Sequence, residues 1–355
     1  PSPAKSSLPR SRPAPTREPV GPRETLDAFR DWLLEQRPGA GGQPPRLSAD
    51  EWTRLVQLTT GTEASTGELK ARCLRDLARI DREADAGVVR RKRALDPEDV
   101  VARSRIAAGL ALALGQEARI LKVRLSPQDV EFGLEESLRT YSDLVRLSTG
   151  PTKQVHALLQ LPSHAWSVER SLARTAGLET RALIALGVRH GLAGEALLTR
   201  ALRDEKNPLI AMLANRAVRE GFGLYALDWA ARVDWVENPF ADTEALREFE
   251  LQRGYEASRL LAALELHAES VSIDEAALSF ARRTGVDEDT AHAEVLAAER
   301  DPLRGIGWLG HEELRALEEK LAKATGPKRG LSLTLMLTRR HPELRSADIA
   351  AACAS

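Results

Sequence analysis

Residues 188–226 read VRHGLAGEALLTRALRDEKNPLIAMLANRAVREGFGLYA, and this stretch decides the fold that we expect. Alanine, leucine, arginine and glutamate dominate it and β-branched runs are scarce, which favours helix. Asn207-Pro208 predicts the start of a long apolar helix over 208–233, because proline is tolerated in the first turn of a helix. Arginine, histidine and glutamate recur along the same stretch, so it also holds candidate site residues.

The whole chain has a similar character. Of its 355 residues, 43% are hydrophobic and 29% are charged, which is typical of a soluble globular protein. The net charge of −1 creates no field that would attract nucleic acid or an anionic membrane. No apolar run approaches the roughly 20 residues that a membrane-spanning helix needs. We therefore expect neither nucleic acid nor a membrane as a partner, and the sequence leaves the oligomeric state open.

Cysteine usage points to a reducing compartment. Cys73 and Cys353 are the two cysteines of the chain, which is too few for a disulfide framework or a cysteine-based metal site. We therefore expect a cytoplasmic protein. Cys73 falls in a predicted helix without a histidine nearby in sequence, so we expect a buried and inert thiol.

The domain organisation is expected to be simple. Residues 1–22 are basic, rich in proline and without the apolar core of a secretory signal, which predicts a disordered tail. No convincing linker follows, so residues 23–355 are expected to form one large helical domain. The expected fold class is all-α.

Residues that are typical of helix starts predict where individual helices begin. Ser48, Thr66, Ser272 and Asp287 stand where a short polar side chain can cap the first turn of a helix. Ser126-Pro127 predicts one more helix, over 127–147, by the same rule that applies to Asn207-Pro208.

One motif connects the chain to a known family. The stretch REGFGLYAL, residues 219–227, is similar to the element Glu-Gly-Trp-Ala-Leu-Tyr-Ala-Glu, and it agrees at Glu220, Gly221, Leu224, Tyr225 and Ala226. Three further stretches, 48–83, 259–295 and 301–317, are similar to other parts of the same family. In their order and spacing they resemble the bacterial domain-of-unknown-function family 885, whose members resemble zinc peptidases of the gluzincin type. The resemblance implies a helical, zinc-peptidase-like domain with a cleft between its N-terminal and C-terminal helices.

The metal motif of that family is degenerate here. Its first element is His-Glu-Ala-x-Pro-Gly-His, and when Gly194 is set on the glycine, Arg189 falls on the first histidine. His190 then falls on the general-base glutamate and Glu195 on the second histidine, while Glu220 alone keeps its type. A guanidinium stays protonated, cannot coordinate a cation and repels it. We therefore expect no metal and no cofactor.

The resemblance and the residue chemistry together predict a repurposed active site. It would perform acid/base chemistry, such as hydrolysis, elimination or cyclisation, on a small polar or peptide-like molecule, with specialised metabolism as a natural setting. The candidate catalytic residues are His190, Glu195 and Glu220. The candidate substrate-binding residues are Arg189, Tyr225, Arg259, His267 and Trp308. One interpretation pairs Arg189 with Glu220 where zinc once sat; in the other, Arg189 points to solvent.

Plainer interpretations stay open for several of these residues. Tyr225 and Trp308 are equally explained by core packing, and a histidine on an apolar helix, such as His267, is more often structural. Two other functions also remain open at this point. One is a metal-dependent hydrolase with substituted ligands, and the other is a non-catalytic binding or scaffold protein that retains the fold.

Overall fold

The computed structural model describes residues 46–84, 130–137, 145–149, 155–162, 166–167, 180–191, 194–196, 198–199, 215–232, 243–326 and 334. They all belong to one compact unit, Arg46–Ser355. The predicted tail over 1–22 lies outside the described residues, as does the first part of the helix predicted over 208–233.

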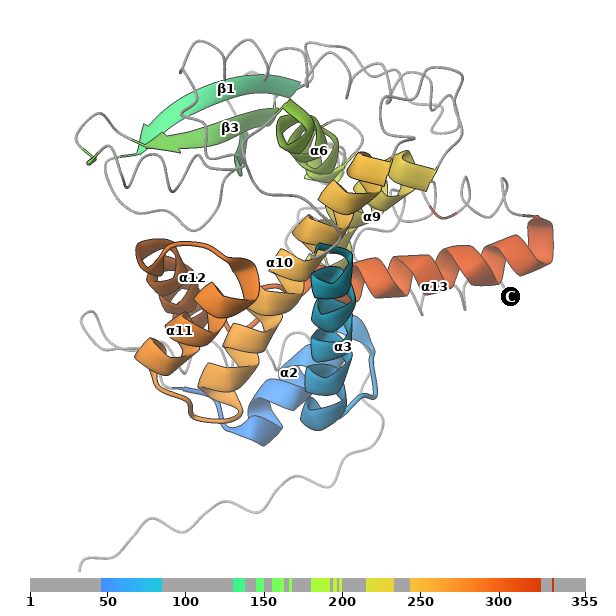
Figure 1. The fold of residues 1–355 in the computed structure, drawn as a ribbon. Coiled ribbons are helices and arrows are strands. Elements are labelled where there is room, and N and C mark those ends of the chain that lie inside the picture. The colour runs from blue at the N-terminus through green and yellow to red at the C-terminus, as the bar shows by residue number, and fades with distance from the viewer. Residues whose placement is uncertain are drawn as a thin grey trace, which may run out of the picture. The chain divides into compact units, whose positions relative to one another are not determined.

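Helices dominate the described part of the chain (Figure 1). The helices are α2 (Ala49–Thr60), α3 (Thr66–Ala84), α6 (Thr180–His190), α9 (Arg216–Arg232), α10 (Thr243–His267), α11 (Ile273–Thr284), α12 (Glu288–Arg300) and α13 (Gly307–Thr325). The predominantly helical fold is therefore confirmed. None of these helices is both long and apolar enough to cross a bilayer.

A small sheet departs from the all-α prediction. Its strands are β1 (Val130–Ser137), β2 (Val145–Thr149) and β3 (Val155–Pro162), in the order β1-β3-β2. β3 pairs in parallel with β1 and antiparallel with β2. The helix predicted over 127–147 is thus wrong. Apolar residues alternate with polar ones or glycine in VEFGLEES, and this period of two outweighs the start signal that Pro127 offers.

The predicted helix caps can be compared one by one. Ser48 and Ser272 each form a capping box, with Glu51 and Glu275, and Asp287 accepts a hydrogen bond from the backbone N–H of Thr290. These three predictions are confirmed.

The fourth cap is displaced by one residue. Thr66 is the first residue of α3, and Ser65 caps the helix instead by accepting a hydrogen bond from the backbone N–H of Glu68. Capping motifs are local in sequence, which explains why they are predicted within one position.

Helix α10 is central to the packing (Figure 1). It contacts α3 on one side and α11 and α12 on the other. One buried cluster joins it to α2 and α3 through Trp52, Leu69 and Leu260, and a second joins it to α11 and α12 through Ala263 and Phe280. Cys73 lies buried in the first cluster, and burial raises the pKa of its thiol, as expected of an inert cysteine.

The crossing of α9 and α13 is very close because glycines form it. A Cβ atom at Gly310 would lie 1.8 Å from the carbonyl oxygen of Ala217, and one at Gly221 would lie 2.3 Å from the backbone carbon of Gly310. The backbones of the two helices are therefore in direct contact. The contact continues at Gly307, where a Cβ atom would lie 2.9 Å from the Cβ of Glu220. The crossing thereby fixes the position of Glu220.

We expect Gly310→Ala to lower the free energy of unfolding by about 3 kcal/mol or more, because the added methyl group has no room between two backbones. Urea unfolding of the purified protein measures this change. Gly67→Ala is the matched control. A Cβ atom there meets nothing within 4 Å, so alanine should stabilise α3 by about 0.5–1 kcal/mol. Equal stability of the two variants would contradict the direct contact between α9 and α13.

Candidate functional site

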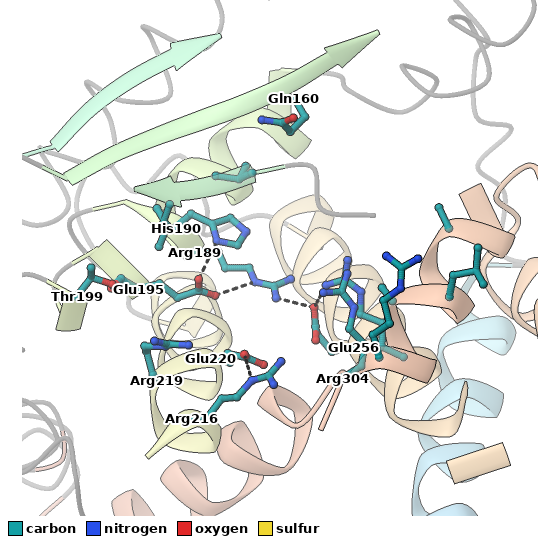
Figure 2. A pocket seen from close by; sticks show the side chains of 18 of the residues that line it. Gln160, Arg189, His190, Glu195, Thr199, Arg216, Arg219, Glu220, Glu256 and Arg304 are labelled. Atoms are coloured by element: carbon teal, nitrogen blue, oxygen red, sulfur yellow. Dashed lines mark hydrogen bonds and ion pairs between the residues drawn. The ribbon is translucent and has the colours of Figure 1, made fainter. Parts of the chain in front are cut away.

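A cavity of about 910 Å³ contains most of the predicted site residues (Figure 2). Its walls come from α6 and the segment after it, from α9, α10 and α12, and from strands β2 and β3. Its ionisable lining residues include Arg189, His190, Glu195, Arg216, Arg219, Glu220, Glu256, Arg259, Arg300 and Arg304. The volume suits a small organic molecule.

Arg189 lies at the end of α6 and is buried, with 7% of its surface exposed. Its Nη2 donates to Oε1 of Glu256 over 2.7 Å, and its Nε lies 3.7 Å from Oε1 of Glu195. Burial by itself would lower the pKa of Arg189, but the two carboxylates outweigh burial and raise it. The guanidinium is therefore a fixed and permanent cation in the cavity wall.

Glu256 links Arg189 to a longer chain of buried charges. The same Oε1 accepts a hydrogen bond of 2.8 Å from Nη1 of Arg259. Arg259 in turn donates to Glu294 over 2.6 Å, and Arg304 donates to Glu294 over 2.9 Å. Burial by itself would raise the pKa of Glu256, but Arg259 and Arg189 lower it to about 2. Alternating signs therefore balance the buried charges along the chain.

His190 and Glu195 form a second unit in the cavity wall, with Nδ1 of the imidazole 3.1 Å from Oε2 of the carboxylate. A carboxylate only accepts, so Nδ1 carries a proton and Nε2 keeps its lone pair in the neutral ring. Two glycines make room for this unit. A Cβ atom at Gly223 would lie 2.8 Å from Oε1 of Glu195, and one at Gly194 would lie 1.8 Å from the carbonyl oxygen of Arg189.

Glu220 enters the cavity from α9 and pairs with Arg216, whose Nε donates over 2.6 Å. Both terminal nitrogens of Arg216 also donate to Asp301, over 2.5 Å each. Burial raises the pKa of the Glu220 carboxyl above its usual value, although Arg216 opposes the shift. The negative charges of Glu256 and Glu195 add to the rise. With 23% of its side chain exposed, Glu220 is an accessible carboxyl group that holds its proton more strongly than usual.

The structure brings together five of the predicted site residues: Arg189, His190, Glu195, Glu220 and Arg259. The predicted pairing of Arg189 with Glu220 is wrong, and so is the alternative in which Arg189 points to solvent. Arg189 is bound by Glu256, and Glu220 by Arg216. Figure 2 shows the two pairs side by side in the same cavity.

Three predicted substrate-binding residues lie elsewhere. Tyr225 is buried and donates from its hydroxyl to Glu318 of α13 over 2.8 Å. The Nε2 of His267 lies 3.0 Å from the carbonyl oxygen of Ala298. Trp308 is buried in the α2–α3–α10 cluster. None of the three is among the described residues that line the cavity, and each is buried in the packing between helices, as the plainer structural interpretations expect.

Sequence reasoning missed Glu256, the residue that organises the cavity. It lies three positions before Arg259 and hence on the same face of α10, which is a usable local signal. Arg216 and Glu220, four positions apart, carry a similar signal. No local pattern indicates the pairing of Arg189 with Glu256, because 67 positions separate them.

The zinc implied by the family resemblance does not fit the residues present. Zinc needs unprotonated imidazole or carboxylate ligands, and here a guanidinium is hydrogen-bonded to Glu256 and lies next to Glu195. Among the described residues, no group of three or more His, Cys, Asp or Glu side chains is arranged to hold a metal ion. We therefore derive no chemistry through zinc at this site.

Comparison with known proteins supports the fold and leaves the function open. No protein-family model and no curated protein matches the sequence. Among solved structures, a putative lipoprotein from Colwellia psychrerythraea is similar, with a TM-score of 0.68 and 15% identity over 93% of this chain and 59% of its own.

A putative lipoprotein of unknown function from Shewanella oneidensis has a TM-score of 0.67 and 12% identity, over 94% of this chain and 63% of its own. This chain thus spans about three fifths of the length of either protein. At these identities the similarity shows a shared fold alone, and it neither supports nor refutes the resemblance to the peptidase-like family.

We expect Glu256→Gln to lower the free energy of unfolding by about 3–5 kcal/mol near neutral pH, because two buried guanidiniums lose their shared carboxylate. Folding lowers the pKa of Glu256 from 4.5 to about 2. Its contribution is therefore fully present above about pH 4.5 and is lost as the pH falls toward about 2. Urea unfolding of both proteins across this pH range measures the difference.

The control for this experiment is Glu269→Gln, which removes a carboxylate from an exposed pair with Lys70. Its effect should stay below about 1 kcal/mol. A difference between wild type and Glu256→Gln that does not shrink on acidification would show that the Glu256 charge does not stabilise the fold.

Proposed function

We propose that this chain is a metal-independent enzyme that performs acid/base chemistry on a small polar or peptide-like molecule. The observation that carries the proposal is that one cavity contains both a partly exposed carboxyl group of raised pKa and a fixed guanidinium, which are held by different partners. These groups are Glu220 and Arg189. Cavities that combine such groups are candidate active sites on physical grounds.

Glu220 is the candidate proton donor and acceptor. A raised pKa moves a carboxyl group toward neutral pH, where it can both give and take a proton during a reaction cycle. Its partner Arg216 is held on the far side by Asp301. The carboxyl group is thus oriented without being fully neutralised, which suits proton transfer to a bound substrate.

Arg189, His190 and Glu195 supply complementary roles. The guanidinium of Arg189 is fixed by Glu256 and can stabilise negative charge that develops on a substrate oxygen. Glu195 orients the imidazole of His190, so that the lone pair of Nε2 in the neutral ring is available as a base. With Glu220 as acid and His190 as base, the cavity supports hydrolysis, elimination or cyclisation.

Replacing Glu220 by glutamine should abolish turnover, with a loss of about 100-fold or more, because glutamine fills the same space but transfers no proton. Chelator-treated protein is incubated with a panel of dipeptides and N-acylated amino acids, and the products are followed by mass spectrometry. Activity that survives chelation and disappears in Glu220→Gln supports the proposal. Glu288→Gln, an exposed glutamate outside the cavity, is the matched control and should retain full activity.

Three results would overturn the proposal in different ways. Activity that chelation removes and zinc restores would indicate the metal-dependent hydrolase with substituted ligands. Activity that persists in Glu220→Gln would exclude that carboxyl group as the acid/base residue. A screen in which ligands bind but none is converted would favour the non-catalytic binding protein.

A cytoplasmic location is also part of the proposal, and it rests on the sparse cysteines. The two similar solved structures are of proteins described as putative lipoproteins. Separation of cells into cytosolic and membrane fractions therefore tests it: recovery of the native protein in the cytosol is expected, and recovery with the membranes would contradict it.

A further inference from the structure

Two arginines of the cavity differ from the others in having no ion pair among the described residues. They are Arg219 on α9 and Arg300 at the end of α12, and both are exposed. The other lining arginines, Arg189, Arg216, Arg259 and Arg304, are each bound to at least one carboxylate.

Arg219 and Arg300 line the same cavity as Glu220. Arg219 precedes Glu220 directly, and it lies on the same face of α9 as Arg216, three positions earlier. Arg300 directly precedes Asp301, which Arg216 binds through both terminal nitrogens. That bidentate pair ties the end of α12 to α9. Figure 2 shows Arg219 beside Glu220 and Arg216 on the α9 wall.

Charge balance distinguishes these two side chains from the buried network. The four paired arginines are opposed by the carboxylates Glu195, Glu220, Glu256, Glu294 and Asp301. Each of these four guanidiniums is thus paired with at least one carboxylate, and the network of four cations and five carboxylates carries no surplus of positive charge. Asp289 also lines the cavity but has an interaction of its own. Among the described lining residues, Arg219 and Arg300 are therefore the arginines whose positive charge has no carboxylate partner.

A guanidinium presents up to five N–H donors and no acceptor, and its planar fork matches the oxygens of a carboxylate or phosphate. Within the paired network, the carboxylates Glu195, Glu256 and Glu294 offset the attraction that its arginines exert on an anion. At Arg219 and Arg300 the same anion meets guanidiniums that are not neutralised by any carboxylate in the described part of the chain. The site therefore favours a ligand with one anionic end and a polar, uncharged remainder.

We propose that the substrate carries an anionic group, a carboxylate or a phosphate, which Arg219 and Arg300 bind next to Glu220. This inference rests on the proposed function, since it places the reacting centre within a few atoms of that anionic group. The inference narrows the proposed substrate class from small polar or peptide-like molecules in general to anionic ones. A peptide or an acylated amino acid with a free carboxylate is an example.

Binding of three small probes tests the inference without any need for turnover. N-acetylglycine carries a carboxylate, N-acetylglycinamide has nearly the same shape without the charge, and inorganic phosphate supplies the other anion. Titrations followed by NMR at low and constant ionic strength give the affinities, because salt screens such contacts. We expect saturable binding of N-acetylglycine, of phosphate or of both, and none of the amide. The anion that binds more tightly shows whether the anionic group of the substrate is a carboxylate or a phosphate.

Arg219→Gln and Arg300→Gln should each weaken binding of that anion at least tenfold. Arg282→Gln removes an exposed arginine that lies outside the cavity and should leave affinity unchanged. Equal binding of acid and amide would overturn the inference, as would dependence on only one of the two arginines or an equal loss in Arg282→Gln. These outcomes are distinct from failure of the proposed function, because Glu220→Gln should retain anion binding even where turnover is lost.

Discussion

The buried ion pair between Arg189 and Glu256 is the interaction on which the site depends. Two charges that are removed from water are tolerated only when each is well matched, and here Glu256 also receives Arg259, which is bound by Glu294. The pair fixes the end of α6 against α10. It also makes a permanent cation of Arg189, the residue that the expected alignment sets on the first histidine of the resembled family's metal motif.

Close backbone packing supplies the second constraint. The contact of α9 with α13 at Gly221 and Gly310 fixes the position of Glu220 in the cavity wall. Gly223 leaves space for the carboxylate of Glu195. A larger side chain at any of these positions would move an ionisable group relative to Arg189. The glycines of REGFGLYAL therefore serve the geometry of the cavity as well as the packing of the helices.

Much of the fold was accessible from the sequence, because its signals are local. The capping boxes at Ser48 and Ser272 and the apolar faces of the helices follow from spacings of three or four residues. The sheet was missed because Ser126-Pro127 carries a helix-start signal directly before a strand. Five of the candidate site residues line one cavity. Their partners could not be predicted, since the choice between Glu220 and Glu256 as the partner of Arg189 depends on the crossing of α6, α9 and α10.

Zinc binding by the purified protein is the most direct test of this account. The protonated guanidinium of Arg189 is hydrogen-bonded to Glu256 and lies next to Glu195, so these residues leave no coordination site for zinc. Metal analysis after expression in zinc-supplemented medium, followed by calorimetric titration of the chelated protein, should detect no tightly held zinc in wild type or in Glu220→Ala. About one zinc per chain in wild type, lost in Glu220→Ala, would contradict it.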